Sequence, residues 1–166
     1  MNATIIQLEP DDWQRYRDIR LRALETDPQA FFSTAEDSRK FNEKEWRRRL
    51  SAEDAGTFVL QGADGNDQGL VGALPYREDD AEPGDYQLVS MWVAPEARGT
   101  GAAHALVHAA LDHARAAAAR RLVLWVAWGN IRAEALYQAH GFKRTGQTGS
   151  FPPPRDTPEL QLAIRL

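Results

Sequence analysis

Apolar and polar positions follow a helical period in one part of the chain and a strand period in others. Between residues 103 and 114, apolar side chains recur at i, i+3, i+4, i+7, i+8 and i+11, which predicts a helix with one apolar face. Residues 86–93 alternate as in a strand. The alternation predicts one face with Gln87, Val89, Met91 and Val93 and another with Tyr86, Leu88, Ser90 and Trp92.

A third apolar segment, residues 122–128, shows no alternation and predicts a strand covered on both faces, as parallel strands are. The order strand, helix, strand implies a right-handed crossover. Asn130 can cap the helix that follows, and Gly141 can end it in the left-handed conformation. Residues 148–158 are rich in proline and predict a stiff loop before a last strand over 159–166.

The N-terminal part begins with a predicted strand over residues 4–8, and acidic residues at 9–12 open a helix that Pro28 ends. Phe31 and Phe32, in the loop that follows, are interpreted as closing the core. Three arginines of this helix are interpreted as a solvated face: Arg15, Arg17 and Arg22.

Asn42 predicts the start of another helix, with Glu45 at its third position and Phe41 able to pack on Trp46. Strands are predicted over residues 57–61 and 70–76, joined by a glycine- and aspartate-rich turn. A second, acidic turn over 78–85 is interpreted as a solvated loop, with attraction of cationic acceptors as the alternative.

The stretch from Leu88 to Ala103 joins a strand, a glycine-bearing loop and a helix start. The first N–H groups of a helix have no internal partner, and the helix dipole adds positive charge there, so this geometry suits a phosphate. Glycine allows close approach because it has no Cβ. A Walker loop is excluded because no Gly-Lys-Ser/Thr sequence follows, and a dinucleotide fingerprint lacks its third glycine at His104.

Two spaced motifs carry a resemblance to a known family. The first is Arg98-x-x-Gly101-x-Ala103, preceded by Val93-x-Pro95. The second motif lies downstream and reads Asn130-x-x-Ala133-x-x-x-Tyr137-x-x-x-Gly141-Phe142. Together the two motifs resemble the GNAT superfamily of acyl-CoA-dependent N-acyltransferases.

The resemblance implies an α+β fold, with a mixed, mostly antiparallel central sheet, helices on both faces, and a fourth and a fifth strand that splay apart. It also implies acetyl-CoA as cosubstrate, with the pantetheine arm between the splayed strands. The main chain of Met91, Trp92 and Val93 would then contact the arm and the acetyl group. The pyrophosphate would bind the loop and helix start formed by Arg98, Gly99, Thr100, Gly101, Ala102 and Ala103.

The second motif supplies the rest of the expected site. Asn130, Ala133 and Tyr137 fall on one stripe of their helix. In similar enzymes the tyrosine protonates the departing thiolate and the asparagine contacts the cofactor; the simpler interpretations are a helix cap and a core aromatic. A phenol of pKa about 10 can donate a proton to a thiolate whose conjugate acid has a pKa near 8.5.

The general base stays open, because Gln87 stands close to where many relatives carry a glutamate. Asp85, Glu36 acting through water, or no dedicated base are the alternatives. His104 and His108 have the spacing of a metal-binding pair but fall on the polar face of their helix, so they are expected to be exposed and no metal is expected.

Composition narrows the function further. The 166 residues suit one domain, and the net charge of -4 argues against a nucleic-acid binder. The chain has no cysteine, so an acyl-cysteine intermediate is excluded. No basic leader or bilayer-length apolar run is present, so a cytoplasmic protein without a membrane partner is expected, as monomer or homodimer.

The sequence therefore predicts an acetyl-CoA-dependent N-acetyltransferase that works by direct attack in a ternary complex, on a small-molecule or peptide amine acceptor. The alternative is a non-catalytic domain of the same fold that binds or senses acyl-CoA. Transfer of a longer acyl group is a further possibility, and nothing in the sequence selects the acceptor.

Overall fold

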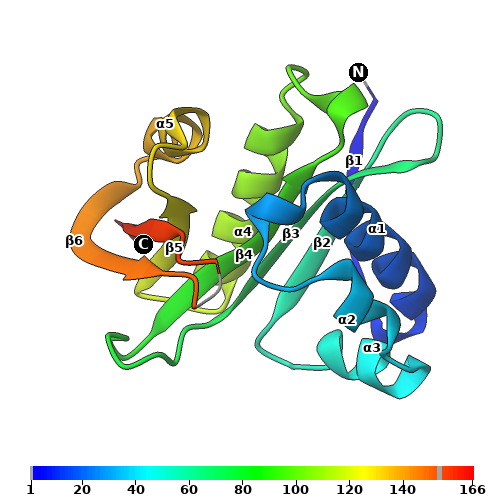
Figure 1. The fold of residues 1–166 in the computed structure, drawn as a ribbon, viewed down its shortest axis with the longest axis horizontal. Helices are drawn as coiled ribbons and strands as arrows, with labels where there is room; N and C mark the ends of the chain where they lie inside the picture. The colour runs from blue at the N-terminus through cyan, green and yellow to red at the C-terminus, as the bar shows by residue number, and fades with distance from the viewer. Residues whose placement is uncertain (1, 153–154) are drawn as a thin grey trace.

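A computed structural model describes residues 2–152 and 155–166. Its centre is a seven-stranded sheet in the order β1-β2-β3-β4-β5-β7-β6 (Figure 1). The strands are β1 (Thr4–Gln7), β2 (Gly56–Gln61), β3 (Asp67–Pro75), β4 (Asp85–Val93), β5 (Arg121–Ala127), β6 (Lys143–Ser150) and β7 (Pro158–Arg165). Neighbours pair antiparallel except β4 and β5, which are parallel and joined by a helix. The predicted α+β class and mixed, mostly antiparallel sheet are confirmed.

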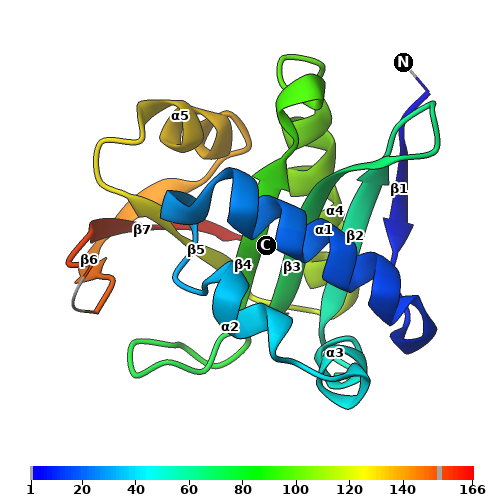
Figure 2. The same cartoon turned by 45° about the vertical axis from the view of Figure 1, so that its right-hand side comes forward.

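Helices cover both faces of this sheet. They are α1 (Trp13–Thr26), α2 (Ala35–Arg39), α3 (Glu43–Arg49), α4 (Ala102–Ala116) and α5 (Ile131–Ala139), with short 3-10 turns at Pro10–Asp12, Pro28–Ala30 and Pro95–Ala97. Figure 2 shows α1 crossing in front of the sheet and α4 behind it. None of the described helices combines the length and apolar character needed to span a membrane.

Two apolar clusters follow from this layering. The first lies under α4 and α5 and includes Leu106, Val107, Ala110, Leu111 and Ala114, the apolar stripe predicted for α4. The second lies under α1 and α3 and includes Ile19, Leu24, Trp46, Leu70 and Trp92. Trp46 anchors α3 as predicted: Asn42 Oδ1 accepts a hydrogen bond from the Glu45 amide at 3.0 Å, and the Phe41 ring packs on Trp46 at 5.4 Å.

A bulge in β4 overturns the predicted alternation of that strand. Leu88 pairs with Ala73 and faces α4, whereas Trp92 pairs with Leu70 and faces α1. One extra residue of β4 lies between the two pairs, and Ser90 there has φ +59°. The sequence predicted that Ser90 and Trp92 share a face with Tyr86 and Leu88. The bulge places them on the opposite face instead. A serine in this conformation carries no apolar signal that could reveal the bulge.

The bulge accompanies the separation of β4 from β5. The two strands pair only from Asp85↔Arg121 to Gln87↔Val123. Beyond these pairs, β4 continues to Val93 and stays paired with β3. Strand β5 continues to Ala127 and stays paired with β7. This confirms the predicted splay, and it leaves two strand edges facing each other inside the sheet.

A buried ion pair closes the narrow end of the splay. Asp85 accepts two hydrogen bonds from Arg121, Nε to Oδ1 at 3.0 Å and Nη2 to Oδ2 at 2.7 Å. Its side chain is 0% exposed and that of Arg121 12%. The acidic turn over residues 78–85 was interpreted from the sequence as a solvated loop. The buried Asp85 shows that this interpretation does not hold for the whole turn. Asp80 in the same turn accepts hydrogen bonds from Tyr76 and Gln161.

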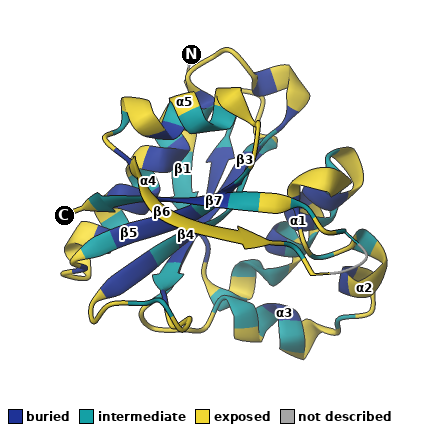
Figure 3. Ribbon diagram, turned by 60° about the vertical axis from the view of Figure 1, so that its left-hand side comes forward, coloured by how far each residue is buried: buried dark blue, intermediate teal, exposed yellow. Residues whose placement is uncertain are grey.

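Several boundaries differ from the predictions. Helix α2 was not predicted; Thr34 caps it by accepting a hydrogen bond from the Asp37 amide. Strand β6 takes in residues 148–150, and β7 begins at Pro158, so the predicted proline-rich loop is shorter, and Pro153 and Pro154 lie outside the described residues. Figure 3 shows β6 exposed along its length, which explains the missing apolar pattern.

Burial corrects three other interpretations. Phe31 is in the core, but Phe32 is 58% exposed and does not close it. Trp128 lies beyond the end of β5 and is 60% exposed. The arginines of α1 do not form a purely solvated face. Arg15 pairs with Asp67 at 2.6 Å and Arg22 with Glu96 at 2.7 Å, and both ion pairs tie α1 to distant segments.

We predict that Asp85→Asn lowers the free energy of unfolding by about 3 to 5 kcal/mol, because it leaves the Arg121 charge buried without its partner. Urea denaturation measures the change. Glu25→Gln is the control: it removes the exposed partner of Arg39 and should cost less than about 1 kcal/mol. Equal losses in the two variants would contradict this assignment.

Candidate functional site

The loop between β4 and α4 presents open backbone at the start of the helix. Gly99 has φ +79° and Gly101, the N-cap residue of α4, has φ +87°. A Cβ at either position would meet no heavy atom within 4 Å, so both face open space. The first amides of α4 have no partner in the preceding turn, as at any helix start, and no side chain caps them. This segment can accept an anion through its main chain.

Side chains of the loop between β4 and α4 fix its position through hydrogen bonds. Arg98 donates from Nε to the Val93 carbonyl at 3.0 Å and from Nη2 to Asp27 at 2.7 Å. Asp27 also accepts a hydrogen bond from the Trp92 indole at 2.7 Å, and Thr100 donates to the Ala97 carbonyl. The Arg98 side chain thus connects the loop to β4 and to the end of α1.

Helix α5 is fixed at both ends. Asn130 Oδ1 accepts a hydrogen bond from the Ala133 amide at 3.2 Å, so the helix cap expected of this residue is present. At the other end, Gly141 has φ +96°, the Phe142 amide bonds the Tyr137 carbonyl, and the Gly141 amide bonds the Gln138 carbonyl. This is a Schellman motif, and its usual apolar contact is made by Tyr137 and Phe142, whose rings lie 5.8 Å apart.

Tyr137 consequently lies in an apolar setting. It is 6% exposed, and burial raises the pKa of its phenol, so the hydroxyl stays protonated at neutral pH. Within the described residues, no group forms a hydrogen bond with this hydroxyl. Such a phenol has a proton to donate.

The structure places five of the predicted site residues on one side of the sheet. Met91, Val93, Ala102, Ala133 and Tyr137 all belong to the apolar cluster under α4 and α5. Trp92 lies on the other side, because the bulge turns its side chain toward α1, where it belongs to the other cluster.

The candidates for a general base differ in their surroundings. The Asp85 carboxylate is committed to Arg121 and to the Glu82 amide, and Glu36 is exposed on α2. Sequence reasoning missed Glu159, which pairs with Ala127 at the end of β5. Its neighbour Leu160 faces the α4 cluster, so Glu159 lies on the opposite face of the sheet. This is the face on which α1 packs, and it is called the α1 side below. Burial raises the pKa of Glu159, a change that makes this carboxylate a stronger base.

Two loops meet at the rim of the α1 side. Phe32, before α2, packs on Phe151, after β6, with ring centroids 6.1 Å apart. Arg155 bridges the same segments, because it donates hydrogen bonds to the Phe31 and Pro28 carbonyls. These contacts join residues more than 100 positions apart, and no local pattern could predict them.

His104 and His108 are exposed on α4, as predicted. The sequence did not reveal that His140, at the end of α5, joins them. His104 Nδ1 lies 2.8 Å from His140 Nε2, and the His108 ring lies 4.8 Å from that of His140. Across residues 2–152 and 155–166, no group of three or more His, Cys, Asp or Glu side chains is arranged to hold a metal.

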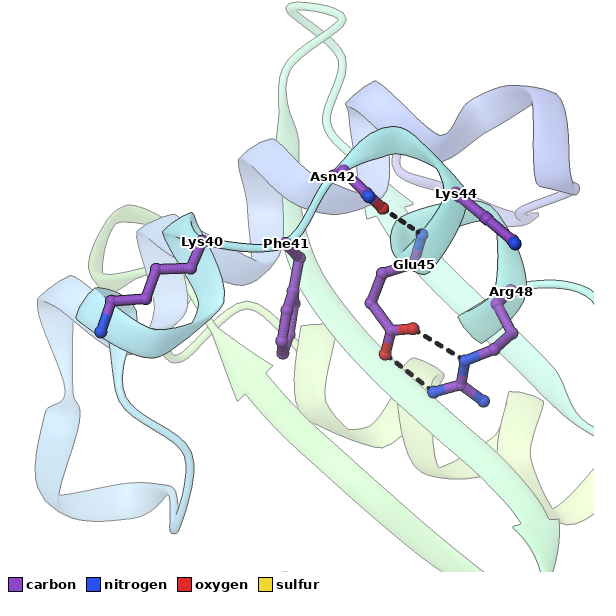
Figure 4. A pocket seen from close by; sticks show the side chains of 6 residues that line it. All are labelled: Lys40, Phe41, Asn42, Lys44, Glu45 and Arg48. Carbon is purple, nitrogen blue, oxygen red and sulfur yellow. Dashed lines mark hydrogen bonds and ion pairs between the residues drawn. The ribbon is translucent and has the colours of Figure 1, made fainter.

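A hollow of about 440 Å³ lies elsewhere, between α2 and the start of α3 (Figure 4). Its lining consists of Lys40, Phe41, Asn42, Lys44, Glu45 and Arg48. The Arg48 guanidinium bonds Glu45 and lowers the pKa of that carboxyl to about 2, so these two charged groups of the lining satisfy each other. None of the predicted site residues lines this hollow.

Comparison with known proteins gives a consistent result. A model of the Acetyltransferase (GNAT) family matches residues 12–142. Human N-acetyltransferase 8 is 39% identical over 80 residues, which are 48% of this chain and 35% of that protein. N-acetyltransferase family 8 member 2 of Rattus norvegicus is 35% identical over 91 residues, 55% of this chain and 40% of that protein. The chain thus spans little more than a third of the length of these curated relatives.

Solved structures share the fold over nearly the whole chain. A putative acetyltransferase from Salmonella typhimurium, solved with its cofactor acetyl-CoA, has a TM-score of 0.79 at 20% identity and covers 100% of this chain and 95% of its own. Spermidine N-acetyltransferase from Vibrio cholerae, in complex with CoA and spermine, has a TM-score of 0.73 at 22% identity, with 98% and 95% covered.

We predict that His140 makes the protein less stable as the pH falls. Burial, His108 and His104 lower the pKa of His140 below its usual 6.5. As the pH falls from the usual pKa of 6.5 toward the lower pKa of His140 in the folded chain, the unfolded state takes up a proton before the folded state does. The free energy of unfolding therefore decreases over this pH range. His140→Gln should flatten this slope in urea denaturation at pH 5 to 8. The exposed control Gln138→Ala should keep the slope, and an unchanged slope in His140→Gln would contradict the assignment.

Proposed function

The chain belongs to the Acetyltransferase (GNAT) family, and from this premise we propose that it transfers an acetyl group from acetyl-CoA to the amine of an acceptor. The observation that carries the proposal is the splay. Strands β4 and β5 lose their pairing after Gln87↔Val123, beside the open start of α4 and the buried phenol of Tyr137. Backbone groups on such edges need hydrogen-bond partners, which the amides of a pantetheine arm can supply.

The residues present fit acetyl-CoA. The main chain from Arg98 to Ala103 would hold the pyrophosphate, because the positive φ angles of Gly99 and Gly101 keep the start of α4 free of side chains. The main chain of residues 91–93 would hold the pantetheine arm and the acetyl group. Asn130 and Ala133 would contact the cosubstrate from the start of α5. Bound there, acetyl-CoA supplies an activated thioester.

The chemistry assigned to this chain is direct acyl transfer in a ternary complex. The acceptor nitrogen forms a bond to the thioester carbonyl carbon, the carbon–sulfur bond breaks, and the amine loses a proton. Tyr137 donates its phenolic proton to the leaving thiolate and is reprotonated from solvent. Because burial keeps this phenol protonated, the proton is available at neutral pH. No acyl-enzyme step is needed, which agrees with the absence of cysteine from the chain.

Other parts of the function stay predictions. The proton of the amine can leave through water or through a carboxylate, for which Glu159 is the candidate on the α1 side. The family membership does not favour the alternative of a non-catalytic acyl-CoA sensor. The identity of the amine acceptor, the acyl chain length, the cytoplasmic location and the monomeric or homodimeric state are expectations carried over from the sequence.

We predict that Tyr137→Phe lowers kcat for thiol release from acetyl-CoA by about 100-fold, the usual contribution of a general acid. The assay uses a panel of amines, and coenzyme A affinity should stay unchanged. Tyr86→Phe is the matched control, since it also removes the hydroxyl of a buried tyrosine but at the paired end of β4. A Tyr137→Phe enzyme with full turnover would remove the phenol from the mechanism.

We predict that Gly101→Glu abolishes coenzyme A binding in titration calorimetry, because it directs a negative side chain at the site of the pyrophosphate. Gly65→Glu controls for backbone strain. Gly65 has φ +84° and also faces open space, but it lies in the turn between β2 and β3. The two variants should lose similar stability while only the first loses affinity. Wild-type affinity in Gly101→Glu would show that the loop does not bind the pyrophosphate.

A further inference from the structure

Helix α1 carries a buried cation that the proposed chemistry does not use. Arg20 is only 8% exposed. Its Nη1 donates a hydrogen bond to Ser90 Oγ at 2.9 Å, and its guanidinium carbon lies 5.0 Å from the centre of the Phe31 ring. A guanidinium has five N–H donors, so a single neutral hydroxyl satisfies only a small part of it.

No carboxylate of the described residues lies within ion-pairing distance of Arg20, although carboxylates pair with most of the buried or half-buried arginines. Arg121, for example, pairs with Asp85, and Arg15 with Asp67. Burial lowers the pKa of Arg20, the nearby phenol of Tyr16 raises it, and a second cation, Arg49, lowers it. A buried charge without a partner is costly, and a charged group perturbed by burial marks a candidate functional site.

The position of Arg20 relates it to the proposed reaction. Ser90 is the bulge residue of β4, just beyond the last pair with β5, where the splay opens. Arg20 contacts it from the α1 side, opposite the cluster that holds Tyr137. Phe31, the other neighbour of Arg20, belongs to the loop that meets Phe151 and Arg155 at the rim. An acceptor that enters from this side to reach the splay passes the guanidinium.

We propose that Arg20 binds a carboxylate of the acceptor, so that the substrate is an amine that also bears a carboxylate, such as an α-amino acid. This inference rests on the proposed function and specifies its substrate class. A guanidinium can bind a carboxylate through two parallel hydrogen bonds, which fixes the position of the amine as well as adding affinity. A polyamine would bring further positive charge toward Arg20 and Arg49 and is disfavoured.

The test compares matched acceptor pairs that differ only in this charge: L-leucine against L-leucinamide, and L-phenylalanine against L-phenylalaninamide. Rates of thiol release are expressed as kcat/KM for the free amine, which corrects for the different fractions of unprotonated amine in the carboxylate and the amide. The wild-type enzyme should prefer the carboxylates by about 10- to 100-fold, the usual effect of a hydrogen bond to a charged group.

Three variants separate recognition from a structural role. Arg20→Met should remove the preference through an increase in KM for the carboxylates while leaving the amides unchanged, and Arg20→Lys should keep part of it. Ser90→Ala removes the hydrogen bond of Arg20 to the bulge and should keep the preference. Thermal unfolding checks that each variant is folded.

The outcomes are distinguishable. Equal kcat/KM for carboxylates and amides in the wild-type enzyme, or an equal loss for both in Arg20→Met, would overturn the role of Arg20 and leave the proposed function intact. Thiol release with none of the amines tested would overturn the proposed function, and this inference with it.

Discussion

The architecture depends on how far β4 and β5 pair. Their hydrogen-bonded register covers three residue pairs, and the buried Asp85–Arg121 ion pair fixes it at the first of them. The bulge at Ser90 then bends β4 away while β3 and β7 hold the outer edges of the two strands. A sheet that is closed at one end and open at the other offers unpaired backbone in its interior. That backbone is the reason to expect an extended, amide-bearing ligand there.

The two faces of the sheet have different roles in the proposed reaction. On the α4 side, the open helix start, the ends of β4 and the phenol of Tyr137 share one apolar cluster, which suits the cosubstrate and the leaving thiol. On the α1 side lie Arg20, Glu159 and the aromatic rim of Phe32 and Phe151, which suit an acceptor. The splay connects these faces, so direct transfer between two bound substrates needs no covalent intermediate on the protein.

Much of this was predictable from local sequence. The stripe of α4, the Asn42 cap with its Phe41–Trp46 contact, the Asn130 cap and the left-handed Gly141 all rest on short-range rules of periodicity and capping, and all are present. The missed features have other causes. The bulge occurs at a serine, β6 has no buried face, and the contacts of Arg20, His140 and Arg155 join residues distant in sequence. Spacing cannot reveal such pairs.

The most direct test of the central claim is a crystal structure of the protein with coenzyme A. The account predicts the diphosphate on the amides of residues 99–103, the pantetheine arm hydrogen-bonded to the main chain of residues 91–93 between β4 and β5, and the sulfur within reach of the Tyr137 hydroxyl. Coenzyme A bound elsewhere, for instance in the hollow at α3, with the splay and the start of α4 empty, would contradict it.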